Sequence, residues 1–180
     1  MKKLLILHGW GTGSVRWQEI KELLENEEIE VLVPDLPGFG KEPPPKKVWG
    51  ARDYEKWVVG FVEKKGWQNF NLLGHSFGGG VAAVVAADYP EKIEKLILCA
   101  PAVIRKKKKG VKTSFFYNIS KAGKKAFFYT FLKSFYPLAQ KAVYKLCGSS
   151  DYYLASGIMK EIFKKVHSES LEKILQEIKT

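Results

Sequence analysis

The chain has few of the features that mark disulfide-rich, membrane-spanning or secreted proteins. It contains two cysteines, Cys99 and Cys147, which are too few for a disulfide framework and suit a reducing compartment. No apolar run approaches the ~18–20 residues that a helix needs to cross a bilayer. The apolar stretch after Lys2 and Lys3 ends at His8, too early for a signal peptide. We therefore expect a cytoplasmic protein without a transmembrane segment.

Acidic residues are missing from one part of the sequence. Residues 101–150 contain 12 Lys and Arg and no Asp or Glu, whereas residues 1–100 contain 13 basic and 14 acidic residues. Lysines and aromatics interleave over residues 105–146, so this segment, and residues 105–125 in particular, could contact anionic lipid or nucleic acid. The alternative, which we favour, is a helical lid with solvated lysines and with aromatics packed over an apolar pocket.

Strand and helix patterns alternate over the first hundred residues. Four aliphatic runs are predicted as strands, at residues 3–7, 29–33, 70–74 and 95–99. Apolar spacing predicts helices between them, at residues 15–25, 53–62 and 78–89, with Ser14 and Asp53 as N-caps of the first two. Such alternation implies right-handed crossovers and a parallel sheet with helices on both faces. The predicted fold class is α/β, a three-layer α/β/α sandwich with four parallel strands.

The strongest motif is Gly74-His75-Ser76-Phe77-Gly78, a G-x-S-x-G sequence between a predicted strand and a predicted helix. This placement is the context that a nucleophile elbow requires. The glycines permit a sharp turn, so the hydroxyl of Ser76 would project from the end of the sheet. The backbone N–H of Phe77 would then point at a developing oxyanion. The alternative is a glycine-rich turn with an incidental serine, and the position of the motif favours the elbow.

A second motif, His8-Gly9-Trp10-Gly11, follows the first predicted strand. In an open α/β sheet, the loops beyond the carboxyl ends of the strands line the site. Such a loop can offer a second backbone N–H opposite that of Phe77, and we expect Trp10 to supply it. The alternative is a glycine-rich turn that leads into a helix. We favour the oxyanion loop, because the chain also contains the G-x-S-x-G motif.

Together these motifs resemble the α/β-hydrolase superfamily, in its esterase, lipase and carbon–carbon hydrolase branch. The matching segments are His8-Gly9-Trp10-Gly11, Pro34-Asp35-Leu36-Pro37-Gly38-Phe39-Gly40, Gly74-His75-Ser76-Phe77-Gly78-Gly79 and Leu96-Ile97-Leu98-Cys99-Ala100-Pro101. The resemblance implies a core over residues 1–101 with the spatial strand order second, first, third, fourth. It also implies a basic helical cap over residues 102–168 and a return to the core over residues 169–180, with helices at 158–166 and 169–178.

In this family the triad runs in the order Ser, then Asp or Glu, then His, with the last two on strands after the cap. The resemblance therefore implies a truncated form of the fold, in which the acid and the histidine are missing from this chain. Within the chain, His8 and His167 are the alternative bases, and His167 could act only if the cap folds inward. We expect His75 to pack beside the elbow, His8 to shape the oxyanion loop together with Gly9, and His167 to end the cap. Asp35, Asp53 and Asp88 are expected to be turn and cap residues.

The missing Asp and His have two conceivable sources. Either a C-terminal fragment was lost by truncation, which we favour, or a partner chain adds strands at the edge formed by residues 95–99. In subtilisin, removing the triad serine or histidine costs about 10⁶ in turnover. We therefore expect the 180 residues alone to be inactive or very weak as an esterase.

The predicted function is that of a serine hydrolase, acting on an ester or similar acyl bond of a small apolar substrate through Ser76 and a backbone oxyanion hole. The alternative is a catalytically inactive module whose basic aromatic cap contacts anionic lipid or nucleic acid. No zinc-type spacing, phosphate-binding loop or dinucleotide fingerprint occurs, so we expect no metal and no cofactor. Cys99 and Cys147 are expected to be buried thiols.

Overall fold

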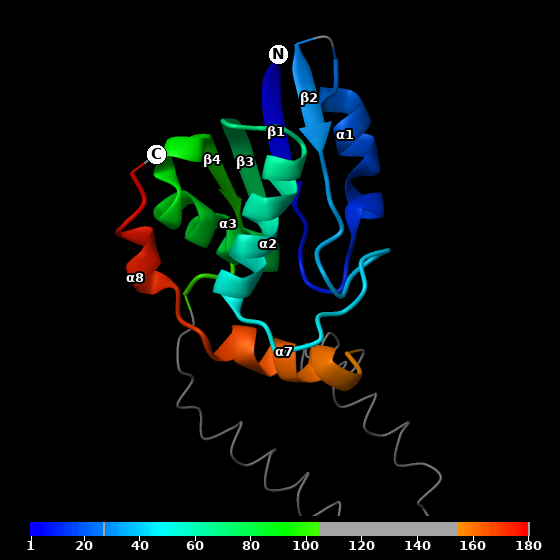
Figure 1. Ribbon diagram of the computed structural model, residues 1–180, viewed down its shortest axis with the longest axis vertical. Coiled ribbons are helices and arrows are strands. Elements are labelled where there is room, and N and C mark those ends of the chain that lie inside the picture. The colour runs from blue at the N-terminus through cyan, green and yellow to red at the C-terminus, as the bar shows by residue number, and fades with distance from the viewer. Residues whose placement is uncertain (27, 105–154, 180) are drawn as a thin grey trace, which may run out of the picture. The chain divides into compact units, whose positions relative to one another are not determined.

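Four parallel strands form the centre of the structure, a computed structural model that describes residues 1–26, 28–104 and 155–179 (Figure 1). The strands are β1 (Lys2–Leu7), β2 (Ile29–Leu32), β3 (Phe70–His75) and β4 (Ile93–Cys99). They are arranged in the order β2-β1-β3-β4, and every pairing is parallel. The predicted sheet and strand order are therefore confirmed.

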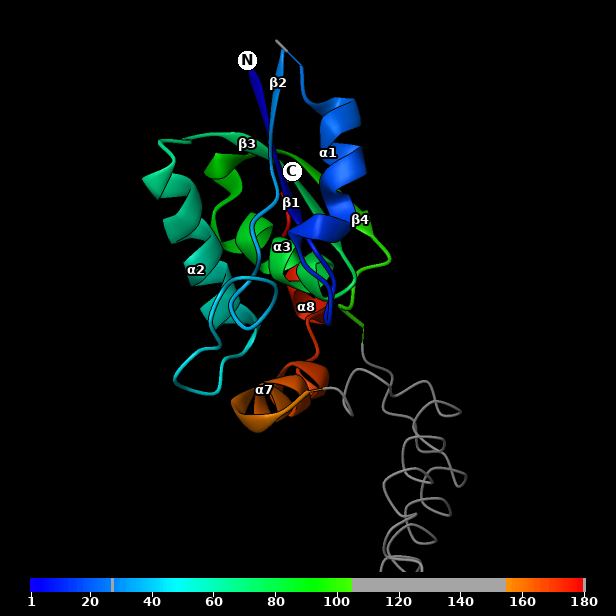
Figure 2. The same ribbon diagram turned by 90° about the vertical axis from the view of Figure 1, so that its right-hand side faces the viewer.

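Helices cover the two faces of the sheet unequally (Figure 2). Helices α2 (Ala51–Lys64) and α3 (Phe77–Asp88) pack on one face, where Leu5 and Leu72 are fully buried in the main core. Of the helices that the structure describes, α1 (Gln18–Leu24) alone lies on the other face; it follows a 3₁₀ turn at Ser14–Trp17 and has no buried residue. The three-layer architecture is confirmed, with a thick core on one side of the sheet and a thin one on the other.

Helix α3 lies closest to the sheet because its side chains are small. Its first ten residues, from Phe77 to Ala86, are all buried, and nine of them are Gly, Ala or Val. A helix without bulky side chains can bring its backbone close to the strands beneath it. The turn between β3 and α3 is thereby fixed at the carboxyl end of the sheet, where parallel strands place their loops.

The first two helices begin differently from the prediction. Ser14 does not cap a helix, because its backbone N–H donates to Asp35 Oδ1 at 2.6 Å within the 3₁₀ turn. The apolar residues of the predicted helix 15–25 would share one face only if the whole segment were α-helical. A 3₁₀ turn has three residues per turn and breaks this alignment, and Val15 and Leu23 are each 83% exposed. Asp53 lies inside α2, where its Oδ2 accepts the Gly50 N–H at 2.7 Å.

The end of the chain returns to the core. Helix α7 (Gly157–Ser168) buries Ile162 and Val166 in the main core, and the short helix α8 (Glu172–Leu175) packs beside α3. The predicted helix over residues 169–178 is thus a single turn. Residues 155–179 belong to the same compact unit as residues 1–104.

Most of the predicted cap, including the basic segment 105–125, lies outside the described residues, and the cap boundaries stay a prediction. Cys147 lies there too. The prediction of a buried thiol is wrong for Cys99, which is exposed on the side of β4 that no described helix covers. Among the helices that the structure describes, none is long and apolar enough to cross a membrane.

The unequal cover of the sheet predicts unequal costs for truncating its aliphatic side chains. Leu72 on β3 is fully buried, whereas Ile97 on β4 is 49% exposed. We expect Leu72→Ala to lower the free energy of unfolding by about 2–5 kcal/mol, the usual cost of a core truncation. We expect Ile97→Ala to cost less than about 1 kcal/mol, because much of its side chain is already in water. Urea denaturation measures both; similar losses would mean that other polypeptide covers Ile97.

Candidate active site

Ser76 sits at the turn between β3 and α3 with a backbone that L-residues rarely adopt. Its φ is 51° and its ψ is −114°. Such a conformation costs of order 1–3 kcal/mol and persists only where the surroundings impose it. Three backbone hydrogen bonds do so here: Ser76 N–H donates to Cys99 O at 3.0 Å, and Ser76 O accepts from Gly80 at 3.2 Å and Ala102 at 2.8 Å. The turn is therefore held by β4, by α3 and by the segment after β4.

The two outer glycines of the motif are required by close contacts. A Cβ on Gly78 would lie 2.4 Å from Leu7 O and 2.5 Å from His8 O. A Cβ on Gly74 would lie 2.6 Å from Gly78 O. All three distances are shorter than the contacts that real Cβ atoms make. The glycines thus let the first turn of α3 approach β1 and β3, and this approach supports the sharp turn at Ser76.

The loop after β1 runs beside Ser76. A Cβ on Gly9 would lie 3.4 Å from Ser76 Cβ and 3.1 Å from His75 Nδ1, so the Gly9 backbone is close to the serine side chain. Trp10 follows it, and its ring lies 5.3 Å from that of Phe77 in an edge-on arrangement. The side chains of Trp10 and Phe77, the two residues whose N–H groups we predict as the oxyanion hole, are therefore in contact with each other.

His8 is fully buried and joins two loops. Its Nε2 accepts the Leu36 N–H at 2.9 Å, and its Nδ1 lies 2.8 Å from Gly9 O. Because Nε2 accepts, Nδ1 carries the proton and donates to Gly9 O. Burial lowers the pKa of this imidazole. Both ring nitrogens are thereby used within the scaffold, as the expected role in shaping the oxyanion loop requires.

Asp35 connects the same loops on their outer side. It accepts the backbone N–H groups of Ser14 at 2.6 Å and Lys41 at 2.9 Å. Burial raises the pKa of its carboxyl, but the donated hydrogen bonds outweigh this effect and the pKa is lowered. Gly40 has a φ of 54°, and a Cβ there would collide with the Asp35 carboxyl. The residue acts as the expected turn residue and fixes the loop after β2.

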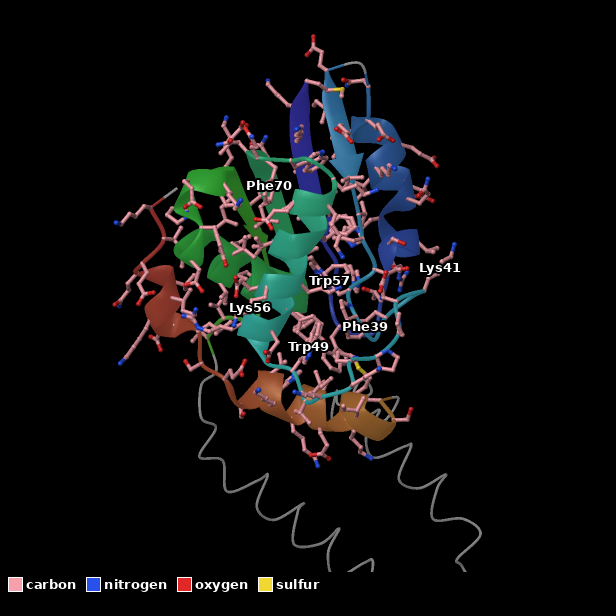
Figure 3. All side chains as sticks on the ribbon, viewed as in Figure 1. Phe39, Lys41, Trp49, Lys56, Trp57 and Phe70 are labelled. Atoms are coloured by element: carbon pink, nitrogen blue, oxygen red, sulfur yellow. The ribbon has the colours of Figure 1, made fainter. Side chains whose placement is uncertain are left out.

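Aromatic rings surround Trp10. Its ring lies 4.9 Å from Phe39, 5.3 Å from Phe77 and 5.1 Å from Phe163, each edge-on. Phe39 comes from the loop after β2, at the end of the core that faces α7 (Figure 3), and Phe163 comes from α7 itself. Such edge-to-face packing is favourable for aromatic pairs. The half-buried Trp10 thus links the core to α7.

The three histidines occupy different places. His75 is half-buried, with its ring 6.1 Å from that of Trp17. His167 lies on α7, stacked on Phe163 at 3.6 Å and 6.3 Å from the Trp10 ring. The structure shows no hydrogen bond between Ser76 Oγ and a histidine of the described residues. Among the described residues, the site thus consists of Ser76 in its strained turn and the loop after β1 beside it, without a histidine hydrogen-bonded to the serine.

Sequence reasoning found Ser76, Phe77, Gly9 and Trp10, which the structure brings together. It missed the contribution of α7. Met159, Phe163 and His167 are spaced four residues apart, which places them along one side of a helix, and this spacing was the available signal.

Comparison with known proteins finds one family that matches most of the chain. A family model described as alpha/beta hydrolase fold matches residues 2–164. The abhydrolase domain-containing protein abhd-5.2 of Caenorhabditis elegans is 35% identical over 103 residues, which are 54% of this chain and 23% of that protein. The 2-hydroxymuconate semialdehyde hydrolase of Pseudomonas sp. strain CF600 is 32% identical over 104 residues, 55% of this chain and 36% of that protein.

Among solved structures, a monoacylglycerol lipase from Paleococcus ferrophilus superposes with a TM-score of 0.53 at 26% identity. The superposition covers 65% of this chain and 45% of the lipase. The matched part of the chain thus spans only about a quarter to a third of the length of these two curated relatives.

The close approach at Gly78 predicts a clear contrast between two glycine substitutions. Gly78→Ala should lower the free energy of unfolding by about 1–3 kcal/mol, because a methyl group would press on the carbonyls of Leu7 and His8. Gly60 lies within α2 with nothing near its Cβ position, so Gly60→Ala should instead stabilise by about 0.5–1 kcal/mol. Thermal and urea unfolding would measure both, and a neutral Gly78→Ala would contradict the tight packing of this turn.

The burial of His8 predicts a pH dependence of stability. Its pKa is lowered in the folded protein, so the unfolded chain binds more protons below about pH 6.5. The contribution of neutral His8 to the free energy of unfolding is therefore complete above this pH. It is lost as the pH falls toward the pKa of His8 in the folded protein. We expect the free energy of unfolding to decrease from pH 7.5 to 5.5, and to do so less steeply in His8→Gln. Parallel profiles for the two proteins would contradict this assignment.

Proposed function

The chain belongs to the alpha/beta hydrolase fold family, and we propose that it is a serine hydrolase that cleaves an ester or similar acyl bond with Ser76 as nucleophile. The observation that carries this proposal is the backbone of Ser76, whose φ of 51° lies at a strand-to-helix turn packed between two glycines. Strained backbone of this kind is concentrated at functional sites, since folding alone gains nothing from it.

In the proposed reaction, Ser76 Oγ attacks the acyl carbonyl carbon while its proton passes to the triad histidine, and the carbonyl oxygen becomes an oxyanion. When the oxyanion collapses, the bond to the leaving group breaks and that group takes the proton; water then hydrolyses the acyl-serine by the same transfers.

The backbone N–H groups of Trp10 and Phe77 stabilise the charge of the oxyanion. Phe77 is the first residue of α3, so its N–H has no partner within the helix, and the helix dipole favours a negative charge there. His8 supports the arrangement by fixing the Gly9 carbonyl, and His75 packs beside the turn.

The proposed substrate is small and apolar around its acyl bond. The half-buried rings of Trp10 and Phe163 support this class, because they are apolar and pack with the ring of Phe77, the residue after Ser76. Two of the similar proteins are named a semialdehyde hydrolase and a monoacylglycerol lipase, which supports hydrolysis as the reaction.

We further propose that residues 102–168 form a cap and that the acid and the histidine of the triad are supplied by polypeptide outside the described residues. A hydrogen bond from Leu171 N–H to Val103 O, 3.0 Å long, supports the cap, because it joins the chain on either side of residues 104–170. The supply of the base from elsewhere is supported by the use of both His8 nitrogens within the scaffold.

Labelling with a fluorophosphonate tests the nucleophile. Without the triad base the oxyanion hole alone supports only slow attack on the reagent, so we expect slow labelling, which reaches one adduct per chain on long incubation and is lost in Ser76→Ala when followed by intact mass. Without the triad base, hydrolysis of p-nitrophenyl esters should remain about 10³–10⁴-fold above water at most, the level that an oxyanion hole and binding alone support.

Ser14→Ala is the matched control, because that serine lies in the 3₁₀ turn before α1 and its backbone N–H and side chain interact with Asp35, away from the turn at Ser76. It should label like the unmodified protein. An adduct that persists in Ser76→Ala, or no adduct in the unmodified protein, would contradict the proposed nucleophile.

A further inference from the structure

Helix α7 is seated on the loops that flank Ser76. Its Ile162 and Val166 are buried in the main core. Met159 lies against Gly38, where φ is 91° and a Cβ would meet the Met159 sulfur. The helix is therefore fixed on the loop after β2, which also carries Phe39 of the aromatic cluster around Trp10.

The same helix turns two rings toward Trp10. Phe163 lies 5.1 Å and His167 6.3 Å from the Trp10 ring, and both are edge-on to it. On its other side Trp10 contacts Phe77. A change in the position of α7 would therefore move the side chain of Trp10 and alter its contact with Phe77. These are the two residues whose amides form the proposed oxyanion hole.

The carboxyl end of α7 is fastened to the amino end of α2. Glu169, the residue after α7, accepts the Ala51 N–H through Oε2 at 2.9 Å. Its other oxygen lies so close to Gly50 that a Cβ there would be 2.2 Å away. A carboxylate at the amino end of a helix is stabilised both by the free N–H groups and by the helix dipole.

A second contact in this region is weaker. Lys165 Nζ lies 3.7 Å from Asp53 Oδ2 and 3.4 Å from Val48 O, and the side chains of Lys165 and Asp53 are 43% and 44% exposed. Ion pairs with this exposure contribute little to stability. Of these two contacts between the end of α7 and the start of α2, that of the half-buried Glu169 is therefore the stronger.

We propose that Glu169 is a positioning residue for substrate selection: by holding α7 on α2 it keeps Phe163 and His167 against Trp10 and limits the size of the acyl group beside Ser76. The effect on acyl-group size rests on the proposed serine hydrolase function. The effect of Glu169 on the position of α7 does not. Loss of the carboxylate lets α7 move away from Trp10 and admits larger groups.

The structural part is tested by ¹⁹F NMR of protein labelled with fluorotryptophan. The Trp10 resonance, assigned with Trp10→Phe, should shift and gain solvent exposure in Glu169→Ala, while the resonance of the buried Trp67 stays in place and reports an intact core. Glu169→Gln keeps an oxygen acceptor for the Ala51 N–H and should show a smaller change. Glu161→Gln removes an exposed carboxylate that pairs within α7 and should show none.

The consequence for selection is tested by labelling rates with an ethyl and an octyl fluorophosphonate. The octyl-to-ethyl ratio should rise about tenfold in Glu169→Ala, the effect expected from losing one charge-assisted hydrogen bond, and should stay unchanged in Glu161→Gln. An unchanged Trp10 resonance in Glu169→Ala overturns the positioning role, and a shifted resonance with an unchanged ratio overturns the role in selection. If Glu169→Ala also moves the Trp67 resonance, the core is disturbed, and Glu169→Gln is then judged by the same two criteria.

Absence of labelling in the unmodified protein contradicts the proposed function. The positioning role of Glu169 is then tested by the Trp10 resonance alone.

Discussion

The contact of Gly78 with the carbonyl groups of Leu7 and His8 is the constraint on which the candidate site depends. It brings the first turn of α3 against the end of β1, where no side chain fits between them. Ser76 is then the single residue that connects β3 to α3, and its positive φ follows from that short path. The same contact places the loop after β1 beside the serine, so the nucleophile and the amides come from one packing arrangement.

The loops around this turn are fixed mainly by polar contacts to backbone groups. His8 holds Gly9 O and Leu36 N–H, and Asp35 holds the N–H groups of Ser14 and Lys41. Each side chain joins segments that are distant in the sequence, and each has its pKa lowered in the fold. Such satisfied polar groups favour one loop arrangement, which a site needs if its donors are to be in place before substrate binds.

The sequence was sufficient for the sheet and the elbow because short-range patterns determine them. Continuous aliphatic runs occur only in strands buried on both sides or nearly so, and the glycines around Ser76 have few other uses between a strand and a helix. It was insufficient where long-range packing decides. The exposure of Val15 and Cys99 depends on what covers one face of the sheet, and the attachment of Glu169 to Ala51 joins residues 118 positions apart.

The central claim is that the amides of Trp10 and Phe77 flank Ser76 as a preformed oxyanion hole. A crystal structure with a phenylboronic acid bound tests it most directly, because boron forms a tetrahedral adduct with a nucleophilic serine. The account predicts a bond from boron to Ser76 Oγ and one boronate oxygen within about 2.7–3.1 Å of both backbone nitrogens. A boronate bonded elsewhere, or an adduct on Ser76 whose oxygens face solvent away from both amides, would contradict it.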